Sequence, residues 1–265
     1  MVFPIRDDNT GRTITPIVNY VLIGLNVLVF ALFQGFGSNE KFTYAFSTVP
    51  QEIVTGQDID RTVTLEDPLG NPVRDEQGRP VGIDLQPTPG SVYLTLLTSM
   101  FMHGGLMHLL GNMLFLWIFG DNIEDDLGHA RYAAFYLVCG VIASLAHVFM
   151  NTSGNDALIP SLGASGAISG VLGAYLLMHP RRRVTVFLFR FLTEVPGVVA
   201  VGLWFAFQIV SSLGLLGGGS QVGGVAYAAH IGGFIAGLAL VKVFAIGRAA
   251  GGGAASGGPM MSRGV

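Results

Sequence analysis

Charged residues are scarce in this sequence, and cysteine is nearly absent. Only 12% of the 265 residues are Asp, Glu, Lys or Arg, whereas soluble domains carry about 25%. With 51% hydrophobic residues, this composition excludes a disordered chain and argues against a water-soluble enzyme. A net charge of −3 without a dense basic stripe excludes nucleic acid as the expected partner. The single Cys139 cannot form an intrachain disulfide, and no zinc-type Cys/His cluster is present.

Long apolar runs are what the sequence has instead. A membrane-spanning helix needs about 20 mostly apolar residues, and six runs meet or approach that length. They are residues 17–35, 93 (or 100)–119, 132–150, 162–178, 195–216 and 225–246. We therefore predict an all-α membrane protein, a bundle of six transmembrane helices over residues 17–246. The apolar stretch 184–192 is predicted to be an interfacial connector.

The placement of Lys and Arg predicts the orientation of the chain. With residues 1–16 in the cytoplasm, ten of the 14 basic residues fall inside, and the other four share one outer loop. Both termini are therefore predicted to be cytoplasmic, with a disordered Gly-rich tail over 247–265. The first apolar run spans and lacks a clear small-residue cleavage site, so no cleavable signal peptide is expected.

The outer loop, about residues 36–90, is a polar extracytoplasmic insertion. It contains nine acidic and four basic residues, with turn signals such as Asp67-Pro68 and Gly70-Asn71-Pro72. Residues 61–65 alternate with β-branched side chains, which favours a short hairpin. Two interpretations are open: a solvated insertion, or a flap that contacts a substrate or partner.

Several polar side chains interrupt the predicted spans, where they are costly and indicate function. A helical rise of ~1.5 Å per residue places four of them, from three helices, in the outer half of the bilayer. These four are His108, Asn112, Ser165 and His230. Small residues also recur every four positions in the fourth and sixth runs, which allows close backbone packing. They are Gly166, Gly170 and Ala174, and Ala229, Gly233 and Gly237.

These side chains suggest nucleophilic chemistry. Ser165 stands at the predicted beginning of the fourth helix, where free backbone N–H groups can stabilise an oxyanion. A serine hydroxyl needs an adjacent base; His230 is the candidate, and His147 is a rival. His108 and Asn112 are four residues apart, share one helix face, and can both donate hydrogen bonds to an oxyanion.

Three motifs occur in order on the second, fourth and sixth runs. They are His103-Gly-Gly-Leu-Met-His108-Leu-Leu-Gly-Asn112, Gly163-Ala-Ser165-Gly166 and Ala229-His230-Ile-Gly-Gly233. In combination they resemble the rhomboid family of intramembrane serine proteases, over roughly residues 15–246. The stretch 120–128, which contains Glu124, also resembles the segment that follows the second helix in that family.

The resemblance implies that Ser165 is the nucleophile and His230 the general base. It further implies an oxyanion hole made by His108, Asn112 and the Ser165 backbone N–H. The implied supporting residues are His103, Gly163, Gly166, Ala229, Gly233 and Glu124. The implied reaction is hydrolysis, through an acyl-enzyme and without cofactor or metal, of a peptide bond in the transmembrane segment of a membrane-protein substrate. The loop 217–224 resembles the family's cap over the site, and the compact form without a presequence implies a prokaryotic plasma membrane.

The sequence departs from the family pattern at two positions near these motifs. Ser169 stands where some members have a tyrosine stacked on the base, which leaves the orientation of His230 open. Asp126 stands where an arginine is expected, which leaves Glu124 without its expected partner.

Two other functions are compatible with parts of the sequence. The first is a catalytically inactive rhomboid relative that acts as a binding or escort protein. The second is a metal-handling membrane protein that uses His103, His108 and His147. Against the second, no carboxylate or thiol cluster accompanies these histidines, and the i,i+5 spacing does not place His103 and His108 on one helix face.

Overall fold

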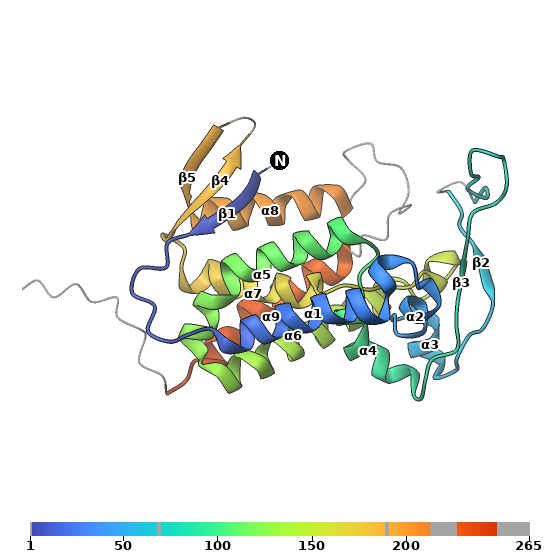
Figure 1. Cartoon of the computed structure of the whole chain (residues 1–265), viewed down its shortest axis with the longest axis horizontal. Helices are drawn as coiled ribbons and strands as arrows, with labels where there is room; N and C mark the ends of the chain where they lie inside the picture. The colour runs from blue at the N-terminus through green and yellow to red at the C-terminus, as the bar shows by residue number, and fades with distance from the viewer. Residues whose placement is uncertain (1, 68–69, 189–190, 213–226, 248–265) are drawn as a thin grey trace, which may run out of the picture.

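The computed structural model describes residues 2–67, 70–188, 191–212 and 227–247. The longer helices run along one direction, with a small sheet at one end and the 36–90 insertion at the other (Figure 1). In chain order they are α1 (Ile17–Leu28), a π-helix (Val29–Phe33), α5 (Leu106–Leu127), α6 (His129–Met150), α7 (Ser165–Met178), α8 (Gly197–Ser212) and α9 (Tyr227–Phe244).

The length of these helices bears on the predicted six spans. Among the described residues, α5, α6 and α9 are long and apolar enough to cross a membrane. The other predicted spans correspond to shorter apolar helices, such as the 14-residue α7 and the 16-residue α8. The count of six spans therefore stays a prediction. The last four residues of the predicted fifth span lie outside the described residues.

The second predicted span is not one helix. Short helical turns η3 (Val92–Leu94), α4 (Thr95–Thr98) and η4 (Ser99–Phe101) are followed by a non-helical stretch before α5 begins. Gly104 and Gly105 lie in that stretch, and adjacent glycines are poor helix formers. At its other end α5 continues to Leu127, eight residues beyond the predicted end at Phe119.

The extension of α5 is polar because it holds the N-terminal segment. The Glu124 carboxylate accepts the backbone N–H groups of Val18 and Asn19 at 2.9 and 2.7 Å, which satisfies donors that the first turn of α1 leaves free. His129 bonds the same carboxylate, and Asp126 pairs with His179 at 2.7 Å. Glu124 therefore lacks the arginine expected at position 126 and is held instead by His129 and by two backbone N–H groups of α1.

A three-stranded sheet corrects the all-α prediction. The strands β4 (Arg183–Leu188) and β5 (Phe191–Pro196) form an antiparallel pair, and β1 (Val2–Asp7) adds to the free edge of β4. The residues predicted as an interfacial connector thus form the two strands of a hairpin. Part of the predicted N-terminal segment forms the third strand of the sheet. Side-chain burial alternates along β4: Val184 and Val186 are buried, whereas Phe187 is exposed. This two-residue period is typical of a strand with one buried face.

Asp7, at the end of β1, connects the sheet to the helices. Its carboxylate accepts hydrogen bonds from the Tyr175 hydroxyl of α7 at 2.9 Å and from the Asn122 amide of α5 at 2.6 Å. Burial, and after it the nearby Asp121 carboxylate, raises the pKa of Asp7 to about 7. The sheet is therefore held against α5 and α7 by a partly buried polar contact.

The 36–90 insertion has a small core of its own. It contains α2 (Glu40–Ala45), α3 (Pro50–Thr55) and a paired β2 (Thr62–Thr64) and β3 (Gly82–Asp84). The predicted strand within 61–65 is confirmed, but its partner is the distant β3 rather than the second arm of a short hairpin. Val49, Val63 and Leu85 form the buried cluster of the insertion. Backbone hydrogen bonds of 2.9 and 2.8 Å between Thr48 and Ser161 join the insertion to the segment that leads into α7.

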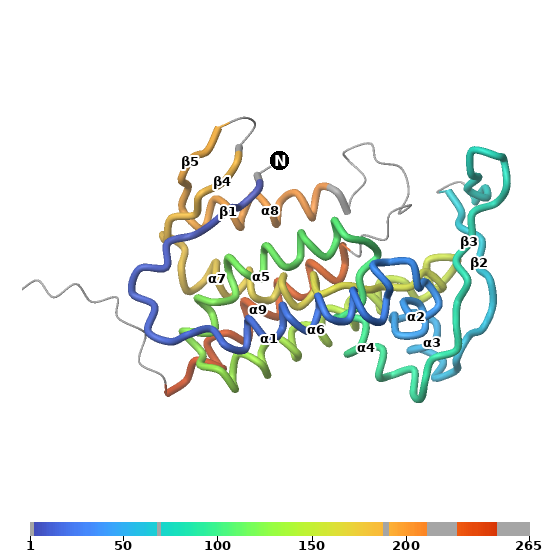
Figure 2. Tube along the Cα trace, viewed as in Figure 1, coloured from blue at the N-terminus to red at the C-terminus, as the bar shows by residue number. Residues whose placement is uncertain are grey.

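Helix α7 lies at the centre of the bundle, in contact with α5, α6, α8 and α9 (Figure 2). Its residues from Gly166 to Tyr175 are all buried. A Cβ on Gly233 would stand 2.1 Å from the Gly166 carbonyl oxygen, and one on Gly237 would stand 2.0 Å from that of Gly170. The predicted close packing of the two small-residue faces is confirmed, and it sets the separation of the residues at their ends.

Candidate active site

Ser165 is the first residue of α7. The turn before it depends on Gly163, whose φ of +118° lies in the region that favours glycine, and whose N–H donates to the Ser99 carbonyl at 2.8 Å. Ser165 is half-buried, and its hydroxyl lies beside a helix N-terminus, where backbone N–H groups have no intrahelical partner.

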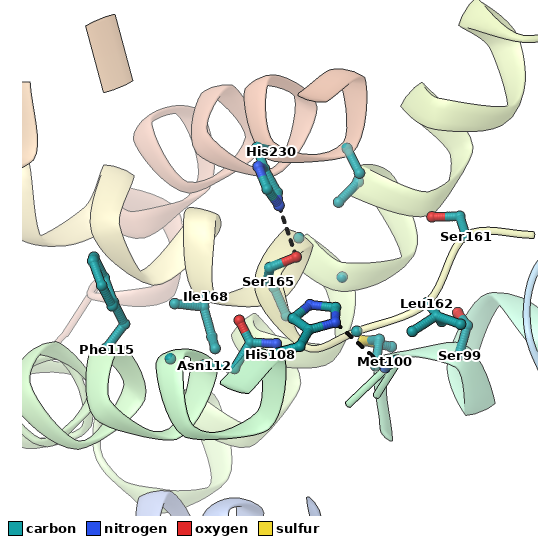
Figure 3. A pocket seen from close by; sticks show the side chains of 18 of the residues that line it. Ser99, Met100, His108, Asn112, Phe115, Ser161, Leu162, Ser165, Ile168 and His230 are labelled. Atoms are coloured by element: carbon teal, nitrogen blue, oxygen red, sulfur yellow. Dashed lines mark hydrogen bonds between the residues drawn. The ribbon is translucent and has the colours of Figure 1, made fainter. Parts of the chain in front are cut away.

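His230 comes from the facing helix, α9. Its Nε2 lies 2.7 Å from the Ser165 Oγ (Figure 3). This distance follows from the glycine contacts between α7 and α9, because larger side chains would hold the two backbones further apart. The structure therefore brings together the serine and histidine that the sequence singled out.

His108 and Asn112 extend from α5 into the same cavity, which has a volume of 790 Å³ and is also lined by Ser165 and His230. In Figure 3 both side chains lie on the side of Ser165 away from His230. The Gly104 N–H donates to the His108 Nδ1 at 3.4 Å, which leaves Nε2 as the N–H donor of a neutral ring. A Cβ on Gly163 would lie 2.9 Å from that Nε2 and 3.6 Å from the Asn112 Nδ2. Both donors thus border the space beside Gly163.

His103 supports this arrangement from outside the cavity. The Asn112 amide nitrogen bonds the His103 Nε2 at 2.9 Å. The His103 backbone N–H and C=O bond the Gln34 side chain at 3.0 and 2.8 Å. His103 precedes α5, so the i,i+5 spacing along one helix does not separate it from His108. The two imidazole rings pack edge-on, with their centroids 5.2 Å apart.

The structure also places the residues whose roles were open. The Ser169 hydroxyl donates to the Ser165 carbonyl at 2.6 Å, within its own helix. The rival base His147 bonds Asn151, whereas the bond to the Ser165 hydroxyl is made by His230. The described part of the chain contains no group of three His, Cys, Asp or Glu side chains that could hold a metal ion. The loop 217–224 lies outside the described residues.

Gln208 is a site residue that the sequence argument missed. It is buried on α8, and its Oε1 lies 2.8 Å from the His230 Nδ1. The Trp204 ring, one turn earlier on α8, packs at 6.1 Å from the same imidazole. The signal was available, because a glutamine inside an apolar run is an intramembrane polar residue of the kind that indicates function.

Apolar helices that surround a hydrogen-bonded serine–histidine pair define the class, an integral multi-pass membrane protein with a serine hydroxyl in contact with an imidazole inside its helical bundle. A family model described as the Rhomboid domain matches residues 90–246, more than half of the chain. The chain therefore belongs to the rhomboid family.

Relatives with this similarity come from bacteria and from mitochondria. "Rhomboid protein 1, mitochondrial" of Saccharomyces cerevisiae is 34% identical over 146 residues, 55% of this chain and 40% of that protein. "Rhomboid protease GluP" of Bacillus subtilis is 34% identical over 145 residues, 55% of this chain and 25% of that protein. "Presenilin-associated rhomboid-like protein, mitochondrial" of Mus musculus is 39% identical over 92 residues, 34% and 24% of the two chains.

These matches cover less than half of the length of each of the three relatives. The mitochondrial relatives argue against the predicted prokaryotic plasma membrane. What stands is membership of a family whose members include a protein named as a protease.

Proposed function

We propose that the protein is an intramembrane serine endopeptidase that cleaves transmembrane segments of membrane-protein substrates. The observation that carries this proposal is the 2.7 Å contact between the Ser165 Oγ and the His230 Nε2 inside a cavity of the bundle. A hydroxyl is a weak nucleophile until an adjacent base can take its proton, and this contact provides that base.

The proposed reaction has two stages. In the first, the Ser165 Oγ attacks the scissile carbonyl carbon while its proton moves to the His230 Nε2. The imidazolium then gives that proton to the leaving amine, the C–N bond breaks, and an acyl-enzyme remains. In the second stage water attacks the ester, with His230 acting again as base and then as acid, and the free carboxyl product leaves.

The proposed oxyanion hole consists of three N–H donors. They are the Ser165 backbone N–H at the beginning of α7, the His108 Nε2–H and the Asn112 side-chain amide. One Asn112 N–H bonds His103, and an amide has two, so the other is available to the oxygen of the tetrahedral intermediate. Gly163 leaves the space between these donors open.

The membrane arrangement of this enzyme is also part of the proposal. Residues 17–246 form the membrane domain, with 36–90 as its outer insertion and 247–265 as a tail. Both termini lie on the side where most basic residues gather, which places the cavity near the opposite surface. A substrate segment would then reach Ser165 from the outer half of the bilayer.

Replacing Asn112 with alanine is expected to lower kcat for cleavage by about 100- to 1000-fold, because one donor to the developing oxyanion is lost. The measurement is the cleavage rate of a model transmembrane substrate in detergent or proteoliposomes, with melting temperature as a check on folding. Asn151→Ala, which removes an amide outside the cavity, should stay within about two-fold. An Asn112→Ala protein that cleaves within about three-fold of wild type would exclude the residue from the oxyanion hole.

The experiment that tests the proposed function is labelling with a fluorophosphonate, which reacts with activated serines. We expect wild type to be labelled and to cleave a model transmembrane substrate, and Ser165→Ala to do neither. Ser169→Ala is the matched control and should be labelled normally, because its hydroxyl bonds its own helix. If folded wild type is neither labelled nor active, the binding or escort alternative replaces the protease. If Ser165→Ala is still labelled, the nucleophile is another serine.

A further inference from the structure

Gln208 is a buried polar residue that the proposed dyad does not require. It lies on α8 with 7% of its surface exposed, in a helix whose sequence is otherwise apolar from Val198 to Val210. Burying an amide in such a helix costs free energy unless it is hydrogen-bonded. The described partner of its Oε1 is the His230 Nδ1, at 2.8 Å.

This contact determines which nitrogen of His230 carries the proton. An amide oxygen only accepts hydrogen bonds, so the His230 Nδ1 must donate. In a neutral imidazole the other nitrogen, Nε2, then holds a lone pair. That nitrogen lies 2.7 Å from the Ser165 Oγ. The hydrogen bond that the His230 Nδ1–H donates to Gln208 thus selects the tautomer whose Nε2 can accept the serine proton.

Other neighbours of His230 limit the motion of its ring without fixing the proton. The Trp204 and Tyr227 rings lie 6.1 and 6.4 Å from the imidazole, centroid to centroid. The indole N–H of a tryptophan can only donate, so Trp204 offers no acceptor to Nδ1. Ser169 stands where some family members have a tyrosine stacked on the base, but its hydroxyl donates to the Ser165 carbonyl.

We propose that Gln208 is a positioning residue that holds His230 in the Nδ1–H tautomer with Nε2 directed at Ser165. The hydrogen-bonded series Gln208–His230–Ser165 then connects α8, α9 and α7, so the base is correctly oriented only while α8 is packed against α9. When Nε2 takes the serine proton, the imidazolium keeps its Nδ1–H bonded to the Gln208 oxygen. The inference rests on the proposed function for its kinetic consequence, but its structural part can be measured separately.

The kinetic test uses Gln208→Met, which preserves the side-chain length and removes the acceptor. We expect kcat for a model transmembrane substrate to fall about 10- to 100-fold, the range for leaving a buried donor unpaired, with KM within about two-fold. The labelling rate by a fluorophosphonate should fall by a similar factor. Gln208→Glu, whose carboxylate oxygens accept from the same N–H, should retain kcat within about ten-fold. The control is Phe207→Leu, on the exposed side of α8, which should match wild type.

The second test is independent of proteolysis. In protein labelled with ¹⁵N-histidine, the His230 signal, assigned by its loss in His230→Ala, should report a proton on Nδ1 in wild type and a mixed or opposite tautomer in Gln208→Met. If wild type fails to cleave but shows this change, Gln208 still positions His230 and the protease proposal fails. If wild type cleaves while Gln208→Met leaves kcat and the tautomer unchanged, the role of Gln208 is overturned and the protease proposal stands.

Discussion

His230→Ala is expected to lower the rate of substrate cleavage by about 10⁴- to 10⁶-fold, the range observed when the base of a serine hydrolase is removed. The imidazole is the group within hydrogen-bond distance of the Ser165 hydroxyl in the described site, and without it the proton has no acceptor as the bond to carbon forms. The measurement is the initial rate on a model transmembrane substrate, with the melting temperature showing that the protein is folded.

Two further variants make this prediction specific. The double variant Ser165→Ala/His230→Ala should be no slower than either single variant, because residues that act as a unit have non-additive effects. His147→Ala removes a different buried histidine, whose Nδ1 lies 3.3 Å from the Asn151 amide nitrogen, and should remain active. Loss of cleavage in His147→Ala, with activity retained in His230→Ala, would reverse the assignment of the base.

Gly237→Ala is expected to destabilise the protein by about 3 kcal/mol or more, above the usual range for overpacking. A Cβ there would stand 2.0 Å from the Gly170 carbonyl oxygen and 2.7 Å from its carbonyl carbon. Both atoms are backbone inside α7, so neither can move aside as a flexible side chain would. To relieve the contact, α9 must move away from α7, which also moves His230 away from Ser165. We therefore expect loss of activity together with a lower melting temperature.

Gly202→Ala provides the matched control for this prediction. Gly202 lies on α8, and a Cβ there would meet nothing within 4 Å. The substitution should be neutral or slightly stabilising, because alanine is favoured over glycine in a helix by about 1 kcal/mol. Thermal melting of purified protein in detergent compares the two variants. Equal melting temperatures for Gly237→Ala and wild type would contradict the close packing of α7 and α9.

Helix positions followed from the sequence where the signals are local. The beginning of α1 at Ile17 and the ends of α6 at Met150 and α7 at Met178 agree with the predicted boundaries. A helix satisfies its backbone within four residues along the chain, so an apolar run and its polar flanks are sufficient. The continuation of α5 to Leu127 was missed because it depends on how the N-terminal segment packs, and the break before α5 was missed although Gly104 and Gly105 are a local signal for it.

The residues of the candidate site were predictable to the extent that their signals are local in the sequence. Ser165, His230, His108 and Asn112 could be named because motif spacing and intramembrane polarity identify them without a fold. Gln208 could have been singled out as a polar residue in an apolar run, but its partner could not. Only the approach of α8 to α9 shows that its amide bonds the His230 Nδ1.

The sequence by itself determined a membrane protein of apolar helices, the small-residue faces that let α7 and α9 meet, and the side chains able to carry out serine chemistry. Only the tertiary structure decided that residues 2–7 form a strand beside 183–188, that Glu124 holds the beginning of α1, and that Gln208 bonds His230. The physical reason is the range of the interactions. Composition and helical hydrogen bonding act along the chain, whereas a strand partner or a side-chain acceptor can be more than 100 residues away, as Glu124 is from Asn19.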